Sequence, residues 1–311
     1  MNEEIISLVK HEFGEPPASI ECIEGGLMHE TYEVEIDQQF LILQISNSGE
    51  KRRKALESGI NFYKLLENSE IPVPKPVNNQ VRTFNGQDYT LVEKEHGKTA
   101  EDSELTDFKI HRSGKTLAKI HNYREFEAPG KIHFRDEEPE VAEKTSNQRT
   151  EKIREDAETL RTTGMSDTAN QIEKFAEKHG DKLTEEFDPV LCHDDYSPDN
   201  LIFEAGKIQA VLDWDLARSG NPQRDLVKSA NSFWMHDPCS QRSIREKFYQ
   251  GYREIRGTGK QFEQLEPFHR VETLVRLVTS LEELRGLEEN EKQVYSDKIQ
   301  YSVQRAHLAC D

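Results

Sequence analysis

Residues 193–225 read HDDYSPDNLIFEAGKIQAVLDWDLARSGNPQRD and bring three oxygen-bearing side chains, Asp195, Asn200 and Asp213, into one short stretch. Moving a phosphoryl group between two oxygens requires magnesium to neutralise its charge and a group that orients the attacking hydroxyl. Magnesium prefers carboxylate and amide oxygens, together with waters and the phosphates of a nucleotide. We therefore predict that Asn200 and Asp213 bind magnesium, and that Asp195 accepts the proton of a substrate hydroxyl as catalytic base.

The polar residues of this stretch lie between short apolar runs, and a turn at Ala205-Gly206 separates the last two runs. The runs are residues 190–192, 201–203 and 208–212. This pattern predicts a strand, a polar loop and a hairpin, with Asp195 and Asn200 on the loop and Asp213 at the far end of the hairpin. Any one of these residues alone is typical of a turn. Together they predict a single site on which all three side chains converge.

The order His-x-Asp, four residues, Asn, a hairpin and Asp-Trp-Asp resembles the aminoglycoside phosphotransferase and choline kinase-like family, small-molecule relatives of the protein kinases. By that resemblance Asp195 is the base of the catalytic loop, and Asn200 and Asp213 are its magnesium ligands. The resemblance also implies that His193 braces the loop by hydrogen bonding. Asp225, in GNPQRDL, matches a family aspartate that anchors the loop without taking part in the chemistry.

The same resemblance implies a bilobal, protein kinase-like α+β fold. We expect residues 1–95 to form a small nucleotide-binding lobe with an antiparallel sheet and one helix, and residues 96–311 to form a larger, mostly helical lobe for catalysis and acceptor binding. A chain of 311 residues is long enough for both. Alternating apolar segments and the Asn85-Gly86 turn predict hairpins in the first lobe. Apolar residues are sparse and charges dense in residues 137–182, which predicts one or two exposed helices there.

Two segments of the expected first lobe are predicted to bind ATP or GTP. The paired glycines Gly25 and Gly26 follow the first apolar segment, where small residues let main-chain amides approach phosphates. A hairpin turn without a ligand is the alternative explanation of this pair. The segment after the Asn85-Gly86 hairpin resembles the family's link between lobes. There, main-chain groups around Glu93 and Glu95 are expected to bond the adenine.

Three apolar segments of the first lobe, residues 20–23, 32–36 and 40–45, are predicted to be antiparallel strands. Gln44 lies on the third of them, at the position where active kinases carry a phosphate-binding lysine. A neutral amide can bond a phosphate oxygen but supplies no full charge, and a charge-assisted hydrogen bond is roughly twice as strong as a neutral one. Arg52, Arg53 or Lys54, which follow closely along the chain, are candidates to replace the missing charge. The alternative is that these three form only a solvated basic face at the start of a helix.

Two departures from the family pattern lie inside the catalytic loop, and both leave the predicted ligands in place. Ser197 stands where the family often has a histidine before the proline. The usual glycine between His193 and Asp195 is Asp194 in this chain. The additional carboxylate has two possible consequences that the sequence does not separate. It either raises the pKa of the neighbouring base or points into solvent.

The composition restricts the class of partner. The chain has 41 Lys plus Arg against 59 Asp plus Glu and a net charge of -18, which disfavours nucleic acid and anionic membranes. A small cationic acceptor fits this balance, and general surface solvation, including adaptation to high salt, explains it equally. The four Cys lack metal-like spacing, and neither a signal peptide nor a membrane-spanning segment is expected, so we expect free thiols in a reducing cytoplasm. The oligomeric state is not specified.

Three functions are compatible with these residues. The first is a small-molecule kinase that uses Mg2+ and ATP or GTP to phosphorylate a hydroxyl of an aminoglycoside-, choline- or sugar-like acceptor. The second is a nucleotide-binding pseudokinase of the same fold, inactive because Gln44 replaces the lysine. The third is a metal-dependent phosphohydrolase with His193-Asp194 as a metal-binding pair, which lacks further histidine ligands at suitable spacing. The complete catalytic loop favours the first.

Overall fold

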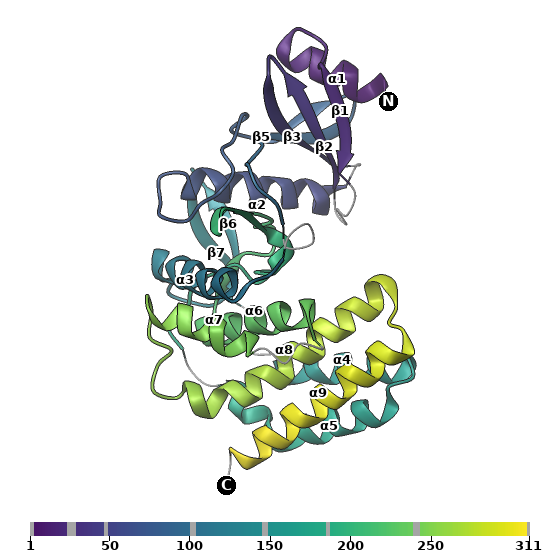
Figure 1. Cartoon of the computed structure of the whole chain (residues 1–311), viewed down its shortest axis with the longest axis vertical. Helices are drawn as coiled ribbons and strands as arrows, with labels where there is room; N and C mark the ends of the chain where they lie inside the picture. The colour runs from purple at the N-terminus through teal and green to yellow at the C-terminus, as the bar shows by residue number, and fades with distance from the viewer. Residues whose placement is uncertain are drawn as a thin grey trace. The chain divides into compact units, whose positions relative to one another are not determined.

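The computed structural model describes residues 3–23, 29–46, 49–99, 104–144, 149–184, 187–238 and 243–309. Its elements form two compact units (Figure 1). Unit 1 comprises Met1–Glu104, His133–Glu140 and Asp199–Leu216, and unit 2 comprises Leu105–Ile132, Val141–Pro198 and Ala217–Asp311. The lobe boundary between residues 95 and 96 stays a prediction.

Unit 1 contains an antiparallel sheet with the order β1-β2-β3-β5-β4. Its strands are β1 (Ser19–Ile23), β2 (Glu30–Ile36), β3 (Gln39–Ser46), β4 (Arg82–Phe84) and β5 (Gln87–Glu93). The Asn85-Gly86 turn adopts positive φ angles of 49° and 82°, and Asp37 and Gln38 do the same between β2 and β3. Two-residue turns with positive φ match the twist of antiparallel strands, which is why these residues form hairpins. The predicted antiparallel start of the chain is confirmed.

The two faces of this sheet differ in character because side chains alternate along a strand. One face packs against α1 (Glu3–Phe13), a helix that the sequence analysis did not predict, and the apolar residues that meet there are buried: Ile5, Leu8, Val9, Val34, Leu43 and Leu91. The other face begins with Ile42 opposite Val92 and continues with two polar pairs, Gln44 opposite Thr90 and Ser46 opposite Asp88, a region we term the polar face. Helix α2 (Glu50–Leu66), which was predicted, contacts β3 and β5. Gln44 therefore lies on the polar face of the sheet.

The hairpin that follows the catalytic loop also belongs to unit 1. It consists of β9 (Leu201–Glu204) and β10 (Lys207–Val211), joined by Ala205-Gly206 with positive φ at both residues. Phe203 exchanges main-chain hydrogen bonds with Lys98, at 2.8 and 3.0 Å. A Cβ on Gly97 would lie 2.5 Å from the carbonyl oxygen of Phe203, so only glycine permits this approach. The predicted hairpin is confirmed and is tied to the segment after β5.

Unit 2 is largely helical. Its elements are α3 (Asp107–Tyr123), α4 (Arg149–Thr162), α5 (Ser166–His179), η1 (Gly180–Thr184), α6 (Pro222–His236), α7 (Ile244–Arg253), α8 (Phe262–Arg285) and α9 (Glu289–Leu308), with β8 (Val190–Cys192) and β11 (Arg218–Gly220). Helices α3 and α7 contact each other closely at Gly114. A Cβ at this position would lie 2.0 Å from the Phe248 carbonyl oxygen, so the absence of a side chain permits the contact. The α+β architecture with a helical C-terminal part is confirmed.

The charge-dense stretch differs from its prediction in two ways. Helices α4 and α5 are present on either side of the Thr162-Thr163-Gly164 turn, but α4 buries Ile153, Ala157 and Leu160 against its neighbours α5 and α8. These few apolar residues are spaced by four and three, so a sparse set still forms one buried face. The strands β6 (Gly130–Arg135) and β7 (Glu138–Lys144) were not predicted. No described helix combines the length and apolarity that crossing a bilayer requires.

Candidate active site

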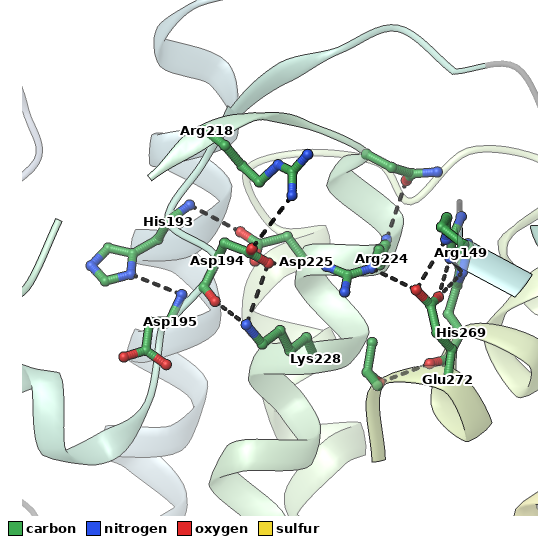
Figure 2. A network of polar contacts seen from close by, with 12 residues as sticks. Arg149, His193, Asp194, Asp195, Arg218, Arg224, Asp225, Lys228, His269 and Glu272 are labelled. Carbon is green, nitrogen blue, oxygen red and sulfur yellow. Dashed lines mark hydrogen bonds and ion pairs between the residues drawn. The ribbon is translucent and has the colours of Figure 1, made fainter. Parts of the chain in front are cut away.

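The catalytic loop of unit 2 follows β8 and begins at His193, which is fully buried. The His193 main-chain N–H donates to Oδ2 of Asp225 at 3.2 Å, and the Asp195 main-chain N–H donates to Nδ1 of His193 at 3.3 Å (Figure 2). The side chain of Asp195 is partly exposed. The side chains of Asp225 and His193 thus bond the main chain of the loop just before Asp195.

Asp225 lies in the first turn of α6 and joins three elements. Its Oδ2 is 3.1 Å from Nε2 of His121 on α3, and Nδ1 of His121 is 2.8 Å from the hydroxyl of Tyr252 on α7. Burial lowers the pKa of His121, although the carboxylate of Asp225 opposes this. His121 was not among the predicted site residues, although the segment LAKIH that it ends (residues 117–121) resembles a helix segment of the family. The neutral imidazole of His121, the phenol of Tyr252 and the carboxylate of Asp225 therefore form a buried network that bonds the main chain of the catalytic loop at His193.

Asp194 has a left-handed backbone, with φ of +59°, and a side chain that is only 16% exposed. Its Oδ1 accepts from Nη1 of Arg224 at 2.9 Å and lies 3.4 Å from Nζ of Lys228, while Nη1 of Arg218 is 4.0 Å from Oδ2 (Figure 2). Burial raises the pKa of Asp194, but the charges of Lys228, Arg224 and Arg218 outweigh it and hold the pKa below its ordinary value. Asp194 does not point into solvent, so that alternative is wrong.

The ion pairs continue from Arg224 into the helices behind it. Nε of Arg224 donates to Oε1 of Glu272 on α8 at 2.9 Å, and Nε of Arg149 on α4 donates to the same oxygen at 3.0 Å. Nη2 of Arg149 donates to Nδ1 of His269 at 2.8 Å. Burial opposes ionisation of Glu272, yet Arg149 and Arg224 hold its pKa well below the ordinary value. A continuous chain of charges therefore links the catalytic loop to α6, α8 and α4.

The two predicted magnesium ligands lie together in unit 1, at the open end of the β9-β10 hairpin. The main-chain N–H of Leu212 donates to the carbonyl oxygen of Asn200 at 2.8 Å, so Asn200 is next to the residue before Asp213. Asp213 has an exposed side chain and a φ of +57°. The main chain thus brings an amide-bearing and a carboxylate-bearing residue near each other, and oxygen donors of these two types fit magnesium, which needs only one or two protein carboxylates. The structure thus brings Asn200 and Asp213 together in unit 1 and Asp195 together with His193 and Asp225 in unit 2.

The basic residues after β3 have different surroundings. On α2, Nε of Arg53 donates to Oε1 of Glu57 at 2.9 Å and Nη1 of Arg53 donates to Oδ1 of Asp88 at 2.6 Å. Lys54 forms an exposed pair with Glu50 at 2.7 Å. The side chain of Arg52 is exposed. Arg53 therefore reaches the polar face of the sheet that also carries Gln44.

The remaining predicted nucleotide residues are only partly visible. Gly25 and Gly26 lie outside the described residues. Glu93 ends β5, and its main-chain N–H donates to the carbonyl oxygen of Lys75 at 2.8 Å, so this N–H is already occupied. Glu95 follows beyond the strand, and burial, followed by the charge of Glu93, raises its pKa.

A family model described as the phosphotransferase enzyme family matches residues 19–258. The chain belongs to this family. It is accordingly a phosphotransferase that acts on a hydroxyl group of a small molecule. A search of curated protein sequences found no match.

Solved structures agree with this assignment in fold. A crystal structure of the aminoglycoside phosphotransferase APH(4)-Ia superposes with a TM-score of 0.70 at 11% identity, covering 97% of this phosphotransferase and 98% of that chain. A ternary complex of a thermostable mutant of that enzyme with AMP-PNP and hygromycin B gives 0.67 at 12% identity, covering 98% and 99%. A putative fructosamine-3-kinase from Thermobifida fusca gives 0.66 at 15% identity, covering 99% and 100%. The kinase-like fold of this phosphotransferase is therefore shown over 97–99% of the chain.

Proposed function

We propose that this phosphotransferase is a small-molecule kinase that transfers the γ-phosphoryl group of ATP or GTP to a hydroxyl of an aminoglycoside-, choline- or sugar-like acceptor. The observation that carries the proposal is the braced catalytic loop, in which Asp225 and His193 bond the main chain next to a partly exposed Asp195. The ternary complex of a structurally similar enzyme with AMP-PNP and hygromycin B supports a nucleotide and a small acceptor as the two substrates.

The proposed roles follow from the donor atoms. Asp195 accepts the proton of the acceptor hydroxyl as that oxygen attacks the γ-phosphorus, and the nucleoside diphosphate leaves. The amide oxygen of Asn200 and the carboxylate of Asp213 hold the magnesium-bound nucleotide. Magnesium supplies neutralisation of the phosphate charge. Gly25, Gly26, Gln44, Glu93 and Glu95 are proposed to line the nucleotide, with His193 and Asp225 as structural supports.

Arg53 is our candidate for the charge that Gln44 does not supply. In active kinases the lysine of the third strand pairs with a glutamate of the following helix. In this chain Glu57 of α2 pairs with Arg53 on the same helix, and the guanidinium also reaches Asp88. Asp88 lies opposite Ser46, two residues along the strand from Gln44, on the same polar face. An arginine held by a helix glutamate at this face resembles the usual lysine-glutamate pair with the cation moved to the helix.

Replacing Arg53 with Met should weaken nucleotide binding by roughly 10-fold or more, because a charge-assisted hydrogen bond to phosphate contributes about 1.5–3 kcal/mol. Isothermal titration calorimetry with magnesium and ATP or GTP measures this change. Arg52→Met is the matched control, since Arg52 is exposed on the same helix, and its affinity should stay within about twofold of the wild type.

The variant Gln44→Lys tests the same idea from the strand. In the Arg53→Met background it should restore nucleotide affinity, because it returns a cation to the polar face of the sheet. In the wild-type background it should add little. Tighter binding in the wild-type background, together with unchanged binding by Arg53→Met, would show that no residue has replaced the lysine.

A pseudokinase is the second candidate, and the neutral Gln44 on β3 is the observation that favours it. The experiment that separates the candidates measures ADP or GDP release with magnesium across cationic, neutral and anionic hydroxyl acceptors. A kinase releases ADP or GDP in an amount that rises with the concentration of acceptors from one class. Magnesium-dependent nucleotide binding without turnover on every acceptor supports the pseudokinase, and phosphate release without an acceptor supports a phosphohydrolase.

A further inference from the structure

The catalytic loop of this phosphotransferase carries a carboxylate, that of Asp194, to which the proposed mechanism gives no role. Its backbone has φ of +59°, in the left-handed region that glycine occupies at little cost and that side-chain-bearing residues rarely adopt. Aspartate tolerates this conformation better than most residues, but contacts around it must still hold it there. We therefore expect contacts of the Asp194 side chain to hold this backbone conformation.

Two basic residues of α6, Arg224 and Lys228, bind Asp194 at its side chain and its main chain. Arg224 donates to Oδ1 at 2.9 Å, and Lys228 lies 3.4 Å from Oδ1 while also donating to the Asp194 carbonyl oxygen. Arg224 and Lys228 are four residues apart and so share one face of the helix (Figure 2). Bonds to both the carboxylate and the carbonyl fix the orientation of the whole residue.

We propose that Asp194 is a positioning residue, which Arg224 and Lys228 clamp to α6 so that the adjoining Asp195 is held in place for phosphoryl transfer. This inference rests on the proposed role of Asp195 as the base. Two attachments then join the loop to α6, the bond from the His193 N–H to Asp225 and the clamp on Asp194. A family glycine at this position keeps the carbonyl oxygen that Lys228 binds but lacks the carboxylate that Arg224 binds.

The clamp is itself rigidly held. Arg224 of α6 bonds both Asp194 and Glu272, and Arg149 also bonds Glu272. The Arg224 guanidinium is therefore bound directly by α8 and, through Glu272, indirectly by α4. Separating one member of a buried ion network leaves the remaining charges uncompensated. Partial opening of this network is therefore unfavourable. A displacement of the base of about 1 Å can cost on the order of 100-fold in rate, so such rigidity bears directly on turnover.

The test compares Asp194→Gly and Asp194→Asn with the wild type in kcat, nucleotide affinity and thermal unfolding. Asp194→Gly removes the carboxylate that Arg224 and Lys228 bind and also relieves the left-handed strain, and kcat should fall about 10- to 100-fold with the nucleotide Kd within about twofold. Asp136→Gly is the matched control, because Asp136 has φ of +50° and an exposed side chain in the β6-β7 turn. Its kcat should equal that of the wild type.

The conservative variant separates positioning from simple stabilisation. Asp194→Asn tolerates the left-handed backbone and keeps a side-chain oxygen that can accept from Arg224, so it should retain more kcat than Asp194→Gly. A residue that only stabilises the fold changes the unfolding temperature in both variants and leaves the kcat of the folded protein unchanged.

Retention of wild-type kcat in folded Asp194→Gly would overturn the proposal. If the wild type transfers no phosphate to any acceptor, the proposed function fails instead, and hydrogen exchange of the loop amides at residues 193–196 tests the clamp without activity. Faster exchange in Asp194→Gly than in Asp136→Gly supports the clamp. Equal exchange in the two variants overturns it.

Discussion

Asp195→Ala protein should lose phosphoryl transfer, with kcat lower by about 100- to 10,000-fold, the range that positioned general bases contribute. Its nucleotide affinity should remain within about twofold of the wild type, because the proposed nucleotide and magnesium residues lie in unit 1 and Asp195 lies in unit 2. Steady-state kinetics with the preferred acceptor and calorimetry with the magnesium nucleotide measure the two effects separately.

Asp188→Ala is the matched control for this experiment. Asp188 is an exposed aspartate of the same unit, just before β8, and it takes no part in the loop network. The control should transfer phosphate at the wild-type rate. Wild-type turnover by Asp195→Ala would disprove the mechanism even if the enzyme proved to be a kinase.

Asp213→Asn protein should bind the magnesium nucleotide at least about 100-fold more weakly. Loss of a group that merely supports a metal ligand costs about 10- to 100-fold in metal affinity or activity, and loss of a charged ligand should cost more. Asparagine is preferable to alanine here because Asp213 has a positive φ of 57°, a conformation that asparagine adopts at lower cost than alanine. Calorimetric titration of nucleotide at several magnesium concentrations measures the loss.

The magnesium dependence identifies the cause of that loss. If Asp213 is a ligand, the affinity of Asp213→Asn should be nearly independent of magnesium, whereas that of the wild type rises with it. Glu204→Gln, which removes an exposed carboxylate from the same hairpin, should retain the wild-type dependence. An unchanged magnesium dependence in Asp213→Asn would show that the metal is held by other residues.

Local signals in the sequence predicted much of the fold. The Asn85-Gly86 turn and the turn at Ala205-Gly206 adopt the positive φ values that such residues allow, and both form the predicted hairpins. Helix α1 was not predicted, although its buried residues Ile5, Leu8 and Val9 have the spacing of one helix face. Helices α4 and α5 were predicted to be exposed because their charge density hid a narrow apolar face, of which Ile153 and Leu160 are part.

The sequence by itself determined the family, the identities of the candidate base and metal ligands, and their spacing, because these depend on residue types in order along one stretch. Only the tertiary structure decided which charges meet. Asp194 binds Arg224 and Lys228, and Arg53 joins Glu57 to Asp88, because folding places helix faces against a loop and a strand distant in sequence. Long-range pairing of this kind leaves no periodic trace in the chain, since each partner alone is an ordinary charged residue.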